Sequence, residues 1–135
     1  MAEDRALGQN RGQLWLSDAR VARQVAEAIR TGESRKEFYE LQAWVIMPNH
    51  VHMLLLPRVA LPQITHWIKG RTARNANLLL GRTGEPFWQD ESYDHWVRNE
   101  KEFNRIAAYI EENPVSAGLV TTPEDWPWSS ATRAS

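Results

Sequence analysis

Apolar residues recur along the chain at spacings that predict three helices and three strands. Behind a candidate N-cap at 17–18, helical spacing predicts a first helix that ends near 31–32. Two apolar stretches flank a Pro-Asn turn at 48–49, and this short connection predicts an antiparallel hairpin. The later elements follow from the same patterns. The predicted ranges are strands at 38–47, 50–56 and 93–98, and helices at 61–80 and 100–112.

Local signals set the ends of the last helix. Asn99 followed by Glu102 resembles a capping box, and Asn113 should stop the helix because the next residue is proline. The tail after this helix should be an extended segment that Trp126 and Trp128 hold in place.

The order of the elements predicts an α+β fold in which helices pack on one face of an antiparallel sheet. A βαββαβ unit would begin with a strand, but residues 13–16 offer only a short stub of one. The length of 135 residues favours a single domain, 1–135, with loose ends at 1–13 and 129–135.

Composition narrows the function classes. With 16 Lys and Arg against 17 Asp and Glu, the net charge is -1, so any nucleic acid would have to bind a local basic patch. The absence of cysteine excludes disulfides, Cys-ligated zinc and thiol catalysis. The charged N-terminus lacks the apolar stretch of a secretory signal, and no apolar run is long enough to span a membrane. We therefore expect a soluble cytoplasmic protein.

The first candidate chemistry is a pair of histidines on the second hairpin strand. Side chains alternate along a strand, so His50 and His52 should share one face while Val51 points to the other. Two such imidazoles can share a divalent metal. Spacing alone favours the plainer alternative, a strand pair with no metal, because a metal site also needs a third ligand.

The second candidate is a tyrosine and an asparagine on the last helix. Tyr109 and Asn113 are four residues apart and should lie on one helical face. Taken alone, Tyr109 is better explained as an amphipathic residue at the edge of the core, and Asn113 as a helix terminator.

Together these stretches resemble the HUH-type single-tyrosine transposases, specifically the IS200-like branch called REP-associated tyrosine transposases. The resemblance covers about 14–132, and the motifs MPNHVH and YIxxNPVxAGLV together make it specific. The matching segments are MPNHVH at 47–52, FWQ at 87–89, YDHWVR at 93–98, YIEENPV at 109–115, AGLV at 117–120 and PEDWPWSSA at 123–131.

The resemblance implies a ferredoxin-like sheet and an enzyme that cleaves and rejoins single-stranded DNA at hairpins. Tyr109 would be the nucleophile, which forms a 5′-phosphotyrosine, and His50, His52 and Asn113 would bind Mg²⁺ or Mn²⁺. His95 matches the family's Asp-His pair and would lie near the metal or the scissile phosphate, although a structural hydrogen-bonding role is the alternative.

Several residues are candidates for holding DNA. Lys69, Arg71 and Arg74 form a basic patch that could follow phosphates, with a solvated helix face as the alternative. Trp88 could stack on an unpaired base, or it could anchor its loop. The segments at 87–89 and 93–98 add Gln89 as a candidate for active-site support and Arg98 for DNA contact.

One departure affects the fold. Family members begin with a strand ahead of the first helix, and we expect this chain to lack it. The explanations are a start site placed too far downstream, a truncated gene copy, or a partner chain that supplies the strand. Two alternative functions stay open. The protein could bind DNA hairpins without cutting them, or it could be a small metal-binding protein unrelated to DNA. The resemblance leaves open whether the protein is a monomer or a dimer.

Overall fold

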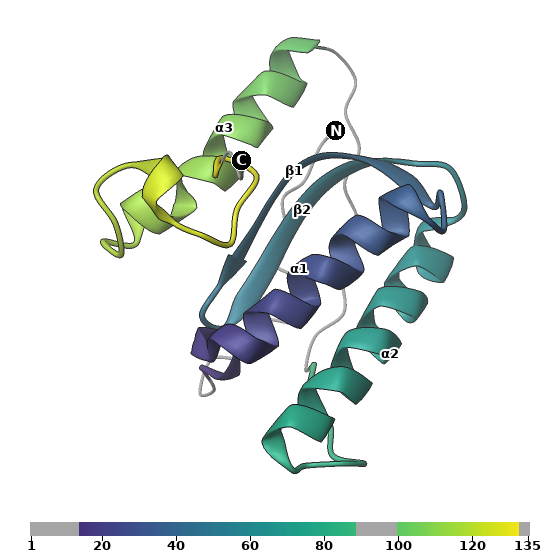
Figure 1. Cartoon of the computed structure of the whole chain (residues 1–135). Coiled ribbons are helices and arrows are strands. Elements are labelled where there is room, and N and C mark those ends of the chain that lie inside the picture. The colour runs from purple at the N-terminus through teal and green to yellow at the C-terminus, as the bar shows by residue number, and fades with distance from the viewer. Residues whose placement is uncertain (1–13, 89–99, 133–135) are drawn as a thin grey trace.

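The computed structural model describes residues 14–88 and 100–132 and confirms the α+β class (Figure 1). The predicted strand at 93–98 and the cap at Asn99 lie outside the described residues. So does the segment 1–13, and the loss of an N-terminal strand therefore stays a prediction. The elements are η1 (Trp15–Ser17), α1 (Ala19–Ser34), β1 (Tyr39–Met47), β2 (His50–Pro57), α2 (Leu61–Leu80), α3 (Glu100–Ser116) and η2 (Pro123–Asp125).

The centre of the molecule is the antiparallel hairpin of β1 and β2. Its register places Val45 opposite His52 and Met47 opposite His50, across the predicted turn. The turn is held from outside the hairpin, because the backbone N–H of Leu16 donates to the carbonyl of Pro48 at 3.0 Å. Residues 15–17 form a 3₁₀ turn, which corrects the expectation of a strand stub there.

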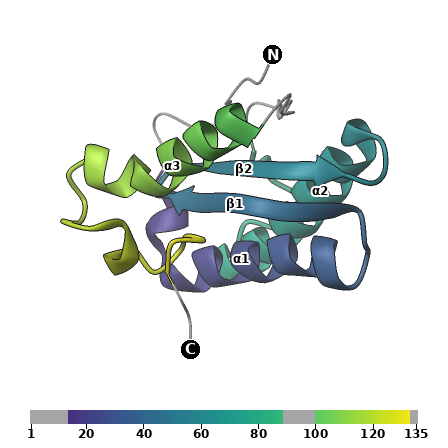
Figure 2. The ribbon, with the colours of Figure 1, turned by 90° about the horizontal axis from the view of Figure 1, so that it is seen from above.

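Helices cover both faces of this hairpin, which corrects the expectation of one covered face. Figure 2 shows α3 on one side of the two strands and α1 on the other. Alternate strand residues divide accordingly between two cores, as the period of a strand requires. Trp44, Ile46, Val51, Met53 and Leu55 pack in the core with α1 and α2, and Ala43, Val45, Met47 and Leu54 pack with Ile106 and Ile110 of α3.

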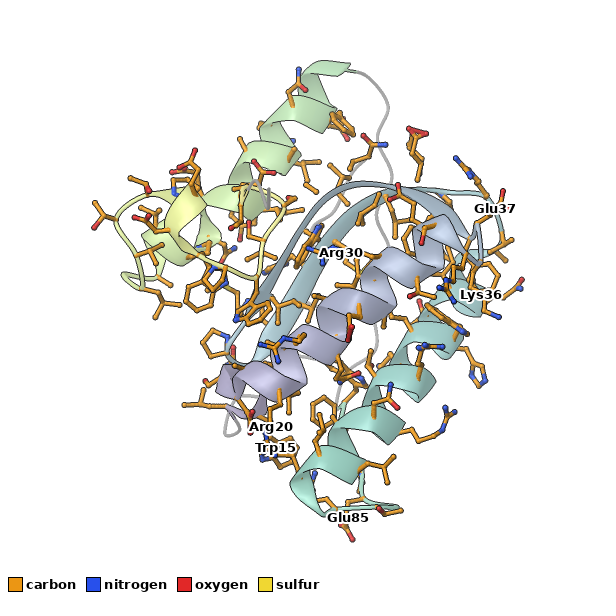
Figure 3. All side chains as sticks on the ribbon, viewed as in Figure 1. Trp15, Arg20, Arg30, Lys36, Glu37 and Glu85 are labelled. Atoms are coloured by element: carbon orange, nitrogen blue, oxygen red, sulfur yellow. The ribbon has the colours of Figure 1, made fainter. Side chains whose placement is uncertain are left out.

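Helix α1 begins at the predicted cap. The carboxylate of Asp18 accepts a hydrogen bond from the backbone N–H of Arg20 at 2.9 Å, and the Arg20 guanidinium donates to it at 2.7 Å. These hydrogen bonds lower the pKa of Asp18 to about 2. Figure 3 shows Arg20 at this end of α1 and Lys36 beyond the other end.

Helix α3 continues through Pro114 to Ser116, which corrects the predicted end at 112. Proline has no N–H to donate to the preceding turn, but the later hydrogen bonds still form. The N–H of Ala117 donates to the carbonyl of Asn113 at 3.0 Å, and Gly118, with a φ of 77°, ends the helix in the left-handed conformation. Asn113 therefore stays helical, one turn after Tyr109.

The tail is ordered along the outer edge of β1. Ser129 forms a bridge with Val45, the N–H of Ile46 donates to the carbonyl of Trp128 at 2.8 Å, and the Trp126 indole donates to the carbonyl of Ile46 at 3.0 Å. Pro123–Asp125 forms the 3₁₀ helix η2 and only Ser129 bridges to the strand, which corrects the expectation of an extended segment, although the indole of Trp126 does hold the tail to β1 as predicted. Residues 129–132 are not the loose end that the sequence predicted, since Ser129 is only 2% exposed.

Within 14–88 and 100–132, none of the helices has the length and apolar content that crossing a membrane requires.

Tyr39 joins β1 to α1. Its hydroxyl donates to the carbonyl of Ile29 at 2.5 Å, and its ring fills the space beside Gly32. Burial raises the pKa of the Tyr39 phenol, and the nearby charge of Glu33 adds to this effect.

We expect Tyr39→Phe to lower the free energy of unfolding at neutral pH by about 1 kcal/mol, because a buried hydrogen bond is lost. A group whose pKa is raised in the folded state contributes stability below its unfolded pKa, here about 10, and loses that contribution as the pH rises further. Urea unfolding between about pH 8 and 11 should therefore show a steeper alkaline loss in the wild type than in Tyr39→Phe. Parallel pH profiles would contradict this assignment.

Candidate active site

Two histidines lie side by side on the face of β2 that α3 covers. The ring centroids of His50 and His52 are 4.7 Å apart, and the rings are nearly perpendicular at 85°. Val51 between them is fully buried in the opposite core. This is the arrangement predicted from strand alternation.

The turn residue Asn49 contacts the ring of His50. Its side-chain oxygen lies 2.6 Å from Nδ1 of His50. Because a carbonyl oxygen can only accept, this contact is a hydrogen bond in the tautomer whose proton is on Nδ1, and in that neutral tautomer the lone pair is on Nε2. A metal-binding histidine commonly donates its other N–H to such an acceptor, so the donor set fits a divalent cation. Sequence reasoning missed this role of Asn49, although its place next to His50 was visible.

Helix α3 brings Tyr109 next to the histidines. The ring centroid of Tyr109 lies 6.2 Å from that of His52, in an edge-on arrangement at 76°. His52 is 7% exposed, whereas Tyr109 is 55% exposed. A solvent-accessible phenol thus borders a buried imidazole at the seam between β2 and α3, where a large substrate could reach it.

Asn113 follows Tyr109 by one helical turn and is half-buried. Helical spacing places the two on one face of α3. Within the described residues, no cluster of three or more His, Cys, Asp or Glu side chains could hold a metal. A third protein ligand from that part of the chain would therefore not be a His, Cys, Asp or Glu side chain. The amide oxygen of Asn113 is the kind of ligand atom that Mg²⁺ and Mn²⁺ accept.

The basic patch lies on a different part of the molecule. Lys69, Arg71 and Arg74 are on α2, which packs in the core on the side of the hairpin opposite to α3. Arg71 and Arg74 are exposed, and the Arg71 guanidinium lies 5.6 Å from the ring centroid of Trp67. The structure therefore does not place this patch beside Tyr109.

Trp88 makes the contacts of a loop anchor. Its indole N–H donates to the hydroxyl of Thr72 at 2.8 Å, and its ring packs edge-on against Phe87 with centroids 4.9 Å apart. These contacts are the ones expected if Trp88 anchors its loop, the alternative to stacking on a base. Gln89, His95 and Arg98 lie outside the described residues.

A contact that no sequence pattern predicted links α3 to the tail. The hydroxyl of Ser130 lies 2.7 Å from a carboxylate oxygen of Glu111, which is two residues after Tyr109. The two residues are 19 apart in the sequence, and no periodicity relates them.

Comparison with known proteins places this chain in a family. The sequence profile described as "Transposase IS200 like" matches residues 7–113. The chain therefore belongs to the IS200-like transposase family.

Two curated relatives and one solved structure are similar to it. The chain is 32% identical over 95 residues to the REP-associated tyrosine transposase of Escherichia coli (strain K12), a match that covers 68% of this chain and 54% of that protein. It is also 32% identical over 104 residues to the putative REP-associated tyrosine transposase of Haemophilus influenzae (strain ATCC 51907 / DSM 11121 / KW20 / Rd), covering 68% of this chain and 58% of that protein. The chain thus spans just over half the length of these relatives.

The solved structure is described as a REP-associated tyrosine transposase bound to a REP hairpin. It superposes with a TM-score of 0.68 at 27% sequence identity, over 96% of this chain and 74% of that one.

We expect Trp88→Phe to lower the free energy of unfolding by about 1–3 kcal/mol, because the hydrogen bond to Thr72 is lost and the smaller phenyl ring fills less of the space that the indole occupies. Affinity for a DNA hairpin should stay the same. Denaturant unfolding and a fluorescence binding titration measure the two effects. Weaker hairpin binding without loss of stability would favour the base-stacking role instead.

Proposed function

We propose that this protein is a metal-dependent endonuclease and strand transferase that acts on single-stranded DNA at hairpins similar to REP sequences. The observation that supports this most is the exposed phenol of Tyr109 next to His52 and His50. The neighbouring solved structure, bound to a REP hairpin, supports the substrate class.

In the proposed reaction, the phenolic oxygen of Tyr109 loses its proton and attacks the scissile phosphorus. The bond from phosphorus to the 3′ oxygen breaks, and that oxygen leaves as a 3′-hydroxyl once it gains a proton. The product is a 5′-phosphotyrosine. A 3′-hydroxyl of the same or another strand can attack this linkage and release Tyr109, so cleavage and joining are one reaction in two directions.

His50, His52 and Asn113 would hold Mg²⁺ or Mn²⁺. The cation, when bound, would withdraw charge from the non-bridging phosphate oxygens and so make the phosphorus more electrophilic. The chain's own part is to orient the imidazole nitrogens. The amide oxygen of Asn49, 2.6 Å from Nδ1 of His50, would do this for His50 by accepting a hydrogen bond from Nδ1.

We expect the wild-type protein to form a covalent adduct with a labelled hairpin oligonucleotide in Mg²⁺ or Mn²⁺, seen as a shifted band on a denaturing gel. Tyr109→Phe should form none, because it lacks the attacking oxygen. Tyr39→Phe is the matched control, since its hydroxyl is buried and bonded to Ile29. An adduct with Tyr109→Phe would refute the assigned nucleophile.

The adduct assay, together with a native gel shift for hairpin binding and a metal titration, separates the alternative functions. Hairpin binding with no adduct in any metal would indicate a binding protein that does not cut. Metal binding without hairpin affinity would indicate a metal-binding protein unrelated to DNA.

We expect His50→Ala and His52→Ala each to weaken Mn²⁺ binding by more than about tenfold, and Asn49→Ala by about tenfold or more through the lost support of His50. His66→Ala, which removes an exposed imidazole from α2, is the matched control. Isothermal titration with MnCl₂ measures all four. Equal affinities in the wild type and His52→Ala would exclude this metal site.

A further inference from the structure

The tail residue Ser130 joins the edge of the sheet to the helix that bears Tyr109. Its backbone N–H donates to the carbonyl of Trp44 at 2.9 Å, so Ser130 is fixed to β1. Its hydroxyl oxygen accepts from the backbone N–H of Trp44 at 2.9 Å and lies 2.7 Å from the Glu111 carboxylate. One side chain therefore contacts both the strand and α3.

The direction of these bonds follows from the single hydroxyl proton. The Ser130 hydroxyl oxygen is 3.2 Å from the carbonyl of Trp44 but 2.7 Å from the carboxylate of Glu111. A hydrogen bond to a carboxylate is shorter and stronger than one to a neutral carbonyl, so the proton goes to Glu111. The Ser130 hydroxyl thus links the backbone of β1 directly to the side chain of Glu111 on α3.

Glu111 and Tyr109 lie on different flanks of α3. Successive residues turn by about 100° around a helix, so these two side chains diverge by about 200°. Ile110 between them is fully buried against the hairpin. The helix is thus held on one flank by Ser130 and presents Tyr109 to His52 on the other.

We propose that Ser130 and Glu111 are positioning residues that fix the rotation of α3 and thereby the place of Tyr109 beside His52. This inference rests on the proposed function of Tyr109. Apolar packing through Ile106 and Ile110 is non-directional and so defines the rotation of the helix less sharply than a hydrogen bond does. With side chains reaching about 5–6 Å from the helix axis, a roll of about 10° moves a side-chain tip by about 1 Å. A displacement of this size can slow a reaction by about 100-fold.

The test compares four variants with the wild type. Glu111→Ala removes the acceptor, and Ser130→Ala removes the donor. Glu111→Gln keeps an acceptor oxygen in the same place and should behave as the wild type does. Glu112→Ala is the matched control, because it removes an exposed carboxylate from the neighbouring position of the same helix.

The first readout is the single-turnover rate of adduct formation at saturating hairpin and Mn²⁺, at a temperature where circular dichroism shows every variant folded. We expect Glu111→Ala and Ser130→Ala to be slower by about 10- to 100-fold with unchanged hairpin affinity. Glu111→Gln should restore the rate. Rates within twofold of the wild type in both alanine variants would overturn the proposal.

The second readout does not depend on activity. Nuclear Overhauser effects between the ring protons of Tyr109 and His52 should be clear in the wild type, Glu111→Gln and Glu112→Ala, and weaker in the two alanine variants. Equal intensities in all five proteins would overturn the proposal. If the wild type forms no adduct, the proposed function fails, while this comparison still decides whether Ser130 and Glu111 position Tyr109.

Discussion

The alternation of side chains along β2 is the constraint on which the rest of this structure depends. Val51 enters the core beneath α1 and α2, so His50 and His52 must face α3. A shift of one residue in the strand would exchange these faces, burying the imidazoles among apolar side chains and removing Val51 from its core. The packing energy of the core therefore also enforces the orientation of the candidate metal ligands.

The candidate site is also shared between the layers of the fold. The histidines come from the hairpin, Tyr109 from α3, and the contacts that hold α3 come partly from the tail along β1. None of these segments contains the site alone. The basic patch on α2 lies on the other side of the β1–β2 hairpin. A DNA strand that contacted both Arg71 and Tyr109 would therefore have to pass around an edge of the sheet.

Much of this arrangement could be predicted from local pattern. The order of elements from 19 to 80, the hairpin turn and the shared face of His50 and His52 all follow from periodicity and turn residues. The second covered face had a signal too: residues 43–47 are apolar without alternation, which is typical of a strand buried on both sides.

Other features could not be predicted, either because a local rule is outweighed by its surroundings or because the feature depends on distant contacts. The rule that a residue before proline leaves the helix is local, and at Asn113 the surrounding hydrogen bonds of α3 outweigh it. The tail looked loose because its residues are small and polar, yet Ser129 and Ser130 are held by β1 and Glu111. Likewise, the anchoring of Trp88 depends on Thr72, which lies on another element.

The central claim, that Tyr109 beside the histidine pair is the attacking group, is tested most directly by locating the covalent bond. After reaction with a hairpin oligonucleotide in Mn²⁺, nuclease and trypsin digestion should leave a nucleotide on the peptide 106–133, in which Tyr109 is the only tyrosine. Mass spectrometry should find the added mass there. Its presence instead on the peptide 83–98, which contains Tyr93, or on neither peptide, would contradict the account.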